Sequence, residues 1–185
     1  VLREGQRPME VVLHYEQGET TIRKIYRFRP DEYLIDIVYE IDNRSNDDFV
    51  AALWVQLKRD GKTASTQTAS NWGPRSFLGV ALTTDETNYE KMDFEDLDDD
   101  SMRETKDGGW IAIIQRYFLA AWVSPTDRQN RYFAEPMGSG LYRAGFVGPE
   151  IGIAPNAFGT YEAQLYAGPK NQKKLGLIAA HLDRT

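Results

Sequence analysis

Cysteine is absent from the 185-residue sequence, and histidine occurs only twice, at His14 and His181. Without cysteine the chain cannot form disulfides, zinc–thiolate sites, iron–sulfur sites or a thiolate nucleophile. Two histidines cannot build a three-histidine metal centre, and these two lack the four-residue spacing of the two-histidine zinc motif. The sequence therefore predicts no metal site and no cofactor.

Long apolar runs and an excess of positive charge are also missing. The longest apolar-rich stretch, Tyr117 to Val123, is about a third of the roughly 20 residues that a membrane-spanning helix needs. Lysine and arginine total 22 against 28 for aspartate and glutamate, which gives a net charge of -6. A chain with this balance offers no broad cationic surface to a phosphate backbone, so we expect no nucleic-acid partner.

The composition that remains is typical of one globular domain. Apolar residues make up 41% and charged residues 27% of the chain, a balance that fills a core and keeps a soluble surface. The length suffices for one ordinary domain. The first residues, Val1-Leu2-Arg3-Glu4, include no initiator methionine and no signal-peptide pattern, so we expect a piece of something longer.

Alternation of apolar and polar residues with a period of two dominates the pattern. From Tyr33 to Ile41 every second residue is aromatic or β-branched. Phe49 to Lys58 alternates in the same way, and the Asp-Gly dipeptide of the following Arg59-Asp60-Gly61-Lys62 predicts a hairpin there. Further strands are predicted at Val11–Tyr15, Thr20–Phe28, Trp110–Ile114, Phe118–Val123, Leu141–Val147 and Tyr161–Ala167. Many short strands separated by turn residues predict a mainly β fold, an antiparallel sandwich or barrel.

Tryptophan positions fit this interpretation. Trp110 and Trp122 flank the apolar stretch and are expected in the core, whereas Trp72 lies in a turn and is expected to be exposed.

The last residues change to a helical pattern. Leu175, Ile178 and Leu182 recur at the three- and four-residue spacing of one helix face. They predict one amphipathic helix from Lys170 to Leu182, even though Gly176 lowers helix stability by about 1 kcal/mol relative to alanine. We expect the three apolar side chains to pack on the sandwich.

An acidic run raises the question of calcium, since six of the eight residues from Asp93 to Asp100 are acidic. Asp96, Asp98 and Asp100 have the spacing of a calcium loop, but its sixth position is Ser101 rather than glycine, and its twelfth is Asp107 rather than glutamate. We therefore interpret the run as a solvated loop.

The sequence also predicts no catalytic residue. It has no Gly-x-Ser-x-Gly nucleophile elbow. His14 is expected on a strand, and His181 is expected near the end of the helix, where a cation interacts favourably with the helix dipole.

Three ordered blocks of sequence resemble one family. They are Lys106-Asp107-Gly108-Gly109-Trp110-Ile111-Ala112 continuing to Trp122, Phe77-Leu78-Gly79-Val80-Ala81 followed by Tyr89-Glu90-Lys91, and Tyr166-Ala167-Gly168-Pro169-Lys170 through Ala180-His181-Leu182-Asp183. With them the chain resembles, over nearly all of its length, the large periplasmic domain of the YidC family of bacterial membrane protein insertases.

The resemblance implies a β-supersandwich of galactose mutarotase-like architecture over residues 1–168. A C-terminal helix over residues 169–185 would then lead toward the next transmembrane segment. The family's domain has further strands before the point that matches Val1, so one sheet edge is expected to be incomplete here.

For function, the resemblance implies a non-catalytic domain at the periplasmic face of the bacterial inner membrane, in a protein that is itself embedded in that membrane. Such insertases insert, fold and assemble integral membrane proteins, alone or with the Sec translocon. The implied partners are nascent inner-membrane proteins and accessory subunits of the Sec translocon. The family's functional groove lies in its transmembrane part, so no site residue can be assigned here beyond the helix-packing set Leu175, Ile178 and Leu182. We expect this packing to fix the angle at which the domain meets the membrane.

Two other hypotheses stay open. A groove lined by aromatic residues could hold unfolded client segments or Sec partners by strand addition or apolar contact. Alternatively, the mutarotase-like architecture could serve a carbohydrate-binding protein or a sugar isomerase. That chemistry needs a histidine within about 3 Å of a substrate proton beside a carboxylate, and the two histidines occupy opposite ends of the chain.

Overall fold

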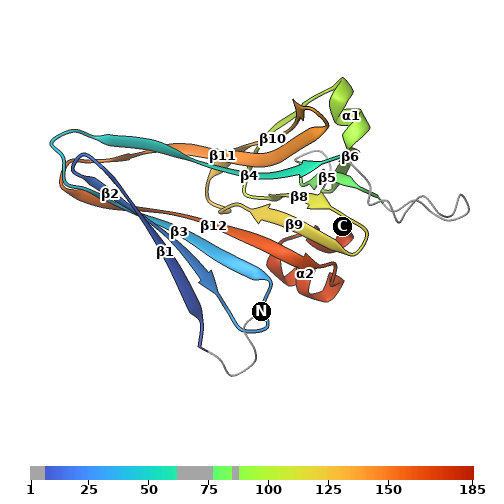
Figure 1. Ribbon diagram of the computed structural model, residues 1–185, viewed down its shortest axis with the longest axis horizontal. Helices are drawn as coiled ribbons and strands as arrows, with labels where there is room; N and C mark the ends of the chain where they lie inside the picture. The colour runs from blue at the N-terminus through green and yellow to red at the C-terminus, as the bar shows by residue number, and fades with distance from the viewer. Residues whose placement is uncertain (1–6, 62–76, 85–87) are drawn as a thin grey trace, which may run out of the picture.

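The computed structural model describes residues 7–61, 77–84 and 88–185 and folds them into two antiparallel sheets with a short helical segment at the C-terminal end (Figure 1). The larger sheet has eight strands in the order β1-β2-β3-β12-β9-β8-β5-β6, and the smaller has four in the order β4-β11-β10-β7. The strands are β1 (Met9–Gln17), β2 (Thr20–Phe28), β3 (Leu34–Asn43), β4 (Phe49–Asp60), β5 (Gly79–Leu82), β6 (Glu90–Asp93), β7 (Met102–Asp107), β8 (Trp110–Ile114), β9 (Phe118–Val123), β10 (Gln129–Gly138), β11 (Leu141–Ile153) and β12 (Ala157–Pro169). The helices are α1 (Phe94–Asp99), α2 (Gln172–Ile178) and the 3₁₀ helix η2 (Leu182–Arg184).

This architecture confirms the predicted mainly β sandwich. Each predicted strand overlaps an observed one, and β2, β8 and β9 have the predicted bounds. The structure adds β5, β6, β7 and β10, which the alternation did not predict. β4 pairs with β11 and not with β5, the next described strand, so the described strands form no hairpin after Asp60. Lys62 of that predicted turn and Trp72 lie outside the described residues.

The space between the two sheets holds the larger apolar cluster. The alternating strands supply its side chains, and the most buried aromatic members are Phe146, Tyr132 and Tyr161. Asn43 joins the ends of the two sheets: its side-chain amide donates to the carbonyl oxygens of Asp47 and Ile153, both at 2.9 Å. These bonds satisfy a side chain that is fully buried, as a polar group in a core requires.

A glycine pair carries the chain from the smaller sheet to the larger. Between β7 and β8, Gly108 and Gly109 have φ angles of 61° and 100°, in a region that residues other than glycine rarely adopt. The buried hydroxyl of Tyr132 donates to the Gly108 carbonyl at 2.7 Å. A side chain at Gly109 would place its Cβ 2.5 Å from the Thr83 hydroxyl oxygen, so only glycine fits there.

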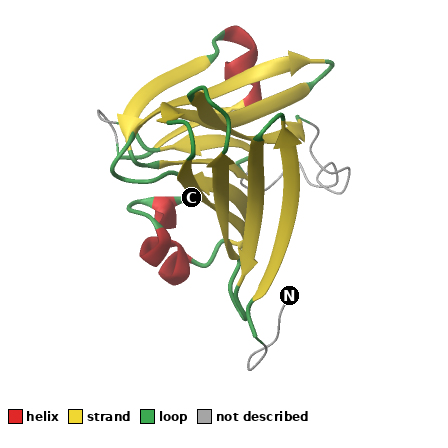
Figure 2. Ribbon diagram, turned by 90° about the vertical axis from the view of Figure 1, so that its left-hand side faces the viewer, coloured by secondary structure: helices red, strands yellow, loops and turns green. Residues whose placement is uncertain are grey.

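The C-terminal segment covers the other face of the larger sheet, away from the smaller sheet (Figure 2). Trp110 belongs to that face, and its indole nitrogen donates to the Ala180 carbonyl at 2.9 Å. Leu175 and Leu182 are fully buried in the same cluster, and Ile178 packs against it half-buried.

The predicted single helix from Lys170 to Leu182 is wrong in its extent. α2 begins only after Asn171, whose side chain accepts a hydrogen bond from the Lys174 amide, and it ends at Ile178. His181 then adopts a left-handed conformation, with a φ of 64°, and starts η2. Leu182 therefore reaches the apolar cluster from a separate helical turn, and His181 does not lie in the last turn of a helix.

The interpretation of the acidic run as a loop is also wrong, because most of it forms α1. Asp93 caps this helix by accepting hydrogen bonds from the amides of Glu95 and Asp96, and the Asp96 side chain caps the Asp93 amide in return. Phe94 and Leu97, three residues apart, are buried against the intersheet core. Reciprocal capping and two apolar anchors stabilise the helix despite its charge.

Replacing a buried leucine of the C-terminal segment tests this packing. Leu175→Ala should lower the free energy of unfolding by about 3 kcal/mol, because it removes a fully buried side chain and leaves a cavity. Urea denaturation measures the change. Leu177→Ala is the matched control in the same helix: its side chain is 88% exposed, and a change within about 0.5 kcal/mol is expected. Equal effects of the two substitutions would contradict the packing.

Candidate functional site

An apolar cleft opens between the two sheets near the start of β4. Its volume is about 310 Å³. The larger sheet contributes Ile22, Tyr39 and Ile41, and the smaller sheet contributes apolar residues of β4 and β11. Its lining residues are Ile22, Tyr39, Ile41, Phe49, Ala51, Ala52, Leu53, Trp54, Ile151 and Tyr161. A cleft lined in this way offers apolar surface rather than the groups needed for chemistry.

A row of exposed apolar side chains on β1 extends the same face of the larger sheet. Met9, Val11, Leu13 and Tyr15 are 41–60% exposed and stand at alternate positions, so they share one face. Val11 is paired with Tyr26, and Tyr26 with Ile37 of the intersheet core. β1 is an edge strand whose described neighbour is β2 (Figure 1). An edge strand with an apolar face is a template for an added extended segment.

Lys24 places a cation among the aromatic rings of this face. Its ammonium group lies 5.0 Å from the Tyr26 ring centroid and 5.1 Å from that of Tyr39. Burial on its own would lower the pKa of Lys24, but hydrogen bonding to the two tyrosines and their charge raise it. The side chain therefore stays charged on an otherwise apolar surface, held there in part by cation–π attraction.

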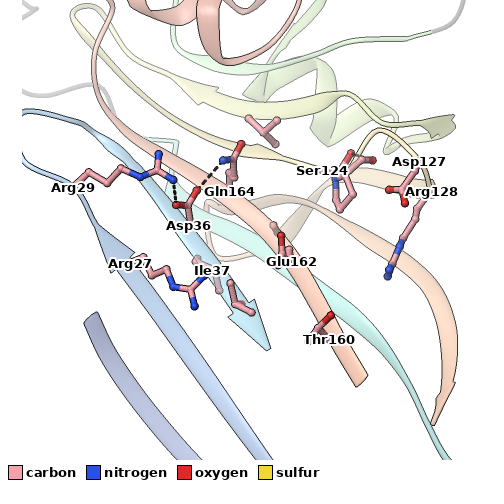
Figure 3. A pocket seen from close by; sticks show the side chains of 14 residues that line it. Arg27, Arg29, Asp36, Ile37, Ser124, Asp127, Arg128, Thr160, Glu162 and Gln164 are labelled. Atoms are coloured by element: carbon pink, nitrogen blue, oxygen red, sulfur yellow. Dashed lines mark hydrogen bonds and ion pairs between the residues drawn. The ribbon is translucent and has the colours of Figure 1, made fainter. Parts of the chain in front are cut away.

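A second, polar pocket of about 500 Å³ lies where β2, β3 and β12 meet the loop that follows β9 (Figure 3). Asp36 is its best-connected group, because it forms an ion pair with Arg29 and accepts a hydrogen bond from Gln164 at 2.8 Å. Asp127 and Arg128 come from the loop on the far side (Figure 3). The Arg128 guanidinium lies 4.5 Å from the centroid of the Tyr161 ring.

The polar pocket lacks the groups that sugar isomerisation needs. Neither histidine lines it: His14 is exposed on β1, and His181 lies at the start of η2. Aromatic side chains, which stack on sugar rings, are also absent from its lining. Within the described residues, no group of three histidine or acidic side chains could hold a metal ion.

A third cluster lies on the smaller sheet, where exposed Trp54 packs edge-on against Phe133 with ring centroids 6.3 Å apart. The Arg143 guanidinium lies within 6 Å of both rings, and its Nε donates to Glu135 at 2.6 Å. Arg103 also pairs with Glu135. Burial acts to raise the pKa of Glu135, but hydrogen bonds and charge from the two arginines outweigh it and lower that pKa.

The pKa of Glu135 predicts how this cluster responds to pH. Glu135→Gln should lower the free energy of unfolding at pH 7 by about 1 kcal/mol, because it leaves two arginines without their carboxylate. The folded-state pKa of Glu135 lies below the ordinary value of a glutamate, so the carboxylate's contribution to stability is fully present above that ordinary value and is lost as the pH falls through the folded-state pKa.

Denaturation curves at several pH values measure this effect. The difference between wild type and Glu135→Gln should shrink on acidification. Glu150→Gln, at an exposed position of neighbouring β11, is the control and should show little difference at any pH. A Glu135→Gln difference that stays constant down to about pH 3 would contradict the pairing.

The residues predicted to act in packing come together, although not on one helix. Leu175, Ile178 and Leu182 all contact the second apolar cluster. The residues that line the cleft could not be named from the sequence, which suggested only an aromatic-lined groove, because the two walls of the cleft come from strands of different sheets. The alternation in β3 and β4 did predict which face of each strand is apolar, and this was the signal that the sequence offered for the cleft.

Comparison with solved structures defines the class of this protein as a galactose mutarotase-like β-sandwich. A galactose mutarotase-like protein from Lactobacillus casei ATCC 334 superposes with a TM-score of 0.57, covering 86% of this chain and 69% of that one. The two chains are only 9% identical, so the likeness describes the fold alone.

Sequence comparison is more specific. The family model described as the YidC periplasmic domain matches residues 1–185. The membrane protein insertase YidC of Saccharophagus degradans is 40% identical over 175 residues, which is 95% of this chain and 31% of that protein. The insertase YidC of Cellvibrio japonicus is 36% identical over 185 residues, which is all of this chain and 33% of that protein. The chain therefore belongs to the YidC periplasmic domain family, and it spans about a third of the length of these relatives.

Proposed function

We propose that this chain is a non-catalytic domain at the periplasmic face of the bacterial inner membrane, part of an insertase that inserts, folds and assembles integral membrane proteins. The observation that carries the proposal is the apolar cleft between the sheets together with the exposed row on β1. Both are suited to hold apolar polypeptide without making or breaking bonds. The described residues include no helix that is long and apolar enough to cross a membrane.

An extended client segment fits this surface in two ways. Its backbone can hydrogen-bond along β1, because an edge strand presents unpaired amides and carbonyls. Its apolar side chains can then cover Val11, Leu13 and Tyr15, and the free energy gained scales with the area removed from water. Nascent inner-membrane proteins supply such segments. Accessory subunits of the Sec translocon are the second class of partner that we propose.

The C-terminal segment has a separate role in this proposal. We assign residues 1–168 to the sandwich and residues 169–185 to a connection that leads toward the next transmembrane segment. Because Leu175, Ile178 and Leu182 pack against the larger sheet, the connection is held in one orientation relative to the sandwich. That packing would fix the angle at which the sandwich meets the bilayer.

Photo-crosslinking in intact membranes tests the docking surface. A photoreactive residue at Leu13 or Tyr15 of the full-length protein should capture nascent membrane proteins or Sec subunits, because these side chains are 53% and 60% exposed. A probe at Phe158, which is 61% exposed but outside the row, is the matched control. Labelling at β1 no stronger than at Phe158 would contradict the proposal. Crosslinks from β1 to the same polypeptide would also contradict it, because the row would then be internal to the sandwich.

Carbohydrate binding is the second candidate, and the polar pocket beside Asp36 and Gln164 is the feature that favours it. Titration with hexoses, followed by tryptophan fluorescence, should give no saturable change. Anomerisation of galactose should proceed at the uncatalysed rate in wild type, His14→Ala and His181→Ala. Turnover in wild type that either substitution abolishes would establish the enzyme and overturn our choice.

A further inference from the structure

The end of the larger sheet beside α2 combines exposed apolar side chains with cations that form no ion pair within the described residues. Tyr117, in the turn between β8 and β9, is 63% exposed, Phe118, at the start of β9, is 54% exposed, and Leu177 of α2 is 88% exposed. Hydrophobic side chains this open to solvent are ordinary when single, but Tyr117 and Phe118 are consecutive, and Phe118 is paired with Pro169 just before α2. We call this region the end surface; it comprises Lys91, Arg116, Tyr117, Phe118, Lys170, Lys173 and Leu177.

Hydrogen bonds and strand pairing hold the parts of the end surface together. Lys170 connects them: its amide donates to the Tyr117 carbonyl at 2.9 Å, and its ammonium group donates to the Gln115 carbonyl at 3.4 Å. Phe118 is paired with Pro169, directly before Lys170. α2 begins two residues after Lys170, and Lys173 and Leu177 lie one turn apart on it. The turn therefore lies beside the start of α2, and the later part of the helix, at Lys174 and Leu177, borders Asp31 and Glu32.

The charge of the end surface is opposite to that of the whole chain. Residues 115–118 and 169–179 contain four cations and no acidic residue, whereas the chain has a net charge of -6. Among the described residues, the cations of the end surface form no ion pair with a carboxylate; the ion pairs involve arginines elsewhere.

Contacts within the end surface show the same excess of positive charge. The Arg116 guanidinium lies 5.1 Å from the Tyr117 ring centroid, so this cation sits over an exposed aromatic ring. Burial and the positive charge of Lys91 both lower the pKa of Lys170. These cations repel one another, and an anionic partner would relieve the repulsion.

We propose that the end surface docks on the surface of an anionic phospholipid bilayer. Aromatic side chains and leucine favour the boundary between headgroups and acyl chains, while lysine and arginine reach anionic headgroups from the same position. Each cation near such a surface adds to the attraction. An acidic protein would satisfy the cations but would leave Tyr117, Phe118 and Leu177 without an apolar environment, so a lipid surface fits all the observations better.

The end surface is separate from the intersheet cleft. β12 starts beside Asn43, close to the cleft residues Ile41 and Tyr161, and ends twelve residues later at Pro169, beside Phe118 (Figure 1). A vesicle measurement therefore tests the end surface without involving client binding, and either proposal can fail without the other.

Co-sedimentation of the 185-residue chain with large phospholipid vesicles tests the proposal. Vesicles of phosphatidylcholine with about 30% phosphatidylglycerol should bind the chain, and this binding should weaken strongly at about 1 M salt. Arg116→Gln with Lys173→Gln should lower the partition coefficient about 25-fold, roughly fivefold for each cation removed. Phe118→Ser with Leu177→Ser should lower the partition coefficient about tenfold, because it removes apolar side chains that would contact the lipid.

Matched substitutions elsewhere on the surface serve as controls. Lys58→Gln with Arg131→Gln removes two exposed cations from the smaller sheet, and Val50→Ser with Phe158→Ser removes two side chains that are 59% and 61% exposed. Both controls should bind as wild type does, and circular dichroism should show every variant folded. The proposal is overturned if wild type does not bind, if it binds pure phosphatidylcholine equally well, if the controls lose as much binding, or if a soluble polyanion such as heparin binds as tightly as the vesicles.

Discussion

Burial of the larger sheet on both faces is the constraint on which the rest of the structure depends. Along β8 every residue from Trp110 to Ile114 is buried, because one set of side chains faces the smaller sheet and the other faces α2 and η2. A strand enclosed on both sides reads as a continuous apolar run rather than as an alternation. The C-terminal segment is therefore the second wall of a core and not an appendage, and Trp110 joins it by a hydrogen bond to Ala180.

This two-sided burial is restricted to one part of the sheet, and the restriction separates the proposed roles. Where the C-terminal segment covers β8, β9 and β12, the sheet is closed, and its end presents cations with exposed aromatic residues. At β1 every side chain but Val12 is exposed, and the apolar face remains open beside the cleft. One sheet thus carries an apolar surface suited to polypeptide and a basic surface suited to lipid headgroups, at different places along β12.

Local patterns in the sequence predicted most of the strands, because side-chain alternation is a property of the strand itself. β2, rich in β-branched and aromatic residues, and β8, a bounded apolar run, were both predicted with their observed bounds. β5 was missed because four residues with glycine and alanine, all buried, give little local signal. The acidic run was predicted to be a loop because its acidic residues outnumber its apolar ones. Only two apolar residues, Phe94 and Leu97, are buried and anchor α1.

The sites depended on information that no local pattern contains. The apolar positions Leu175, Ile178 and Leu182 were predicted from the sequence. The interruption of the helix before His181 was not, because it depends on how η2 packs against the sheet. The cleft forms only where β3 faces β4 and β11 across the two sheets. The hydrogen bond from Asn43 of β3 to Ile153 of β11 joins the sheets there, between residues that are 110 positions apart in the sequence. Similarly, Arg116 and Lys170 become neighbours only because β9 pairs with β12.

Native-state amide hydrogen exchange tests the central claim most directly, because it measures the stability of each segment in the intact chain. If the C-terminal segment is a wall of the core, the Leu175 and Ala179 amides should exchange with the same opening free energy as the amides of β8. The Ala179 amide donates to the Leu175 carbonyl, so it reports directly on α2. Exchange of these amides many orders of magnitude faster, with β8 still fully protected, would show that the sheet does not need the segment and would contradict this account.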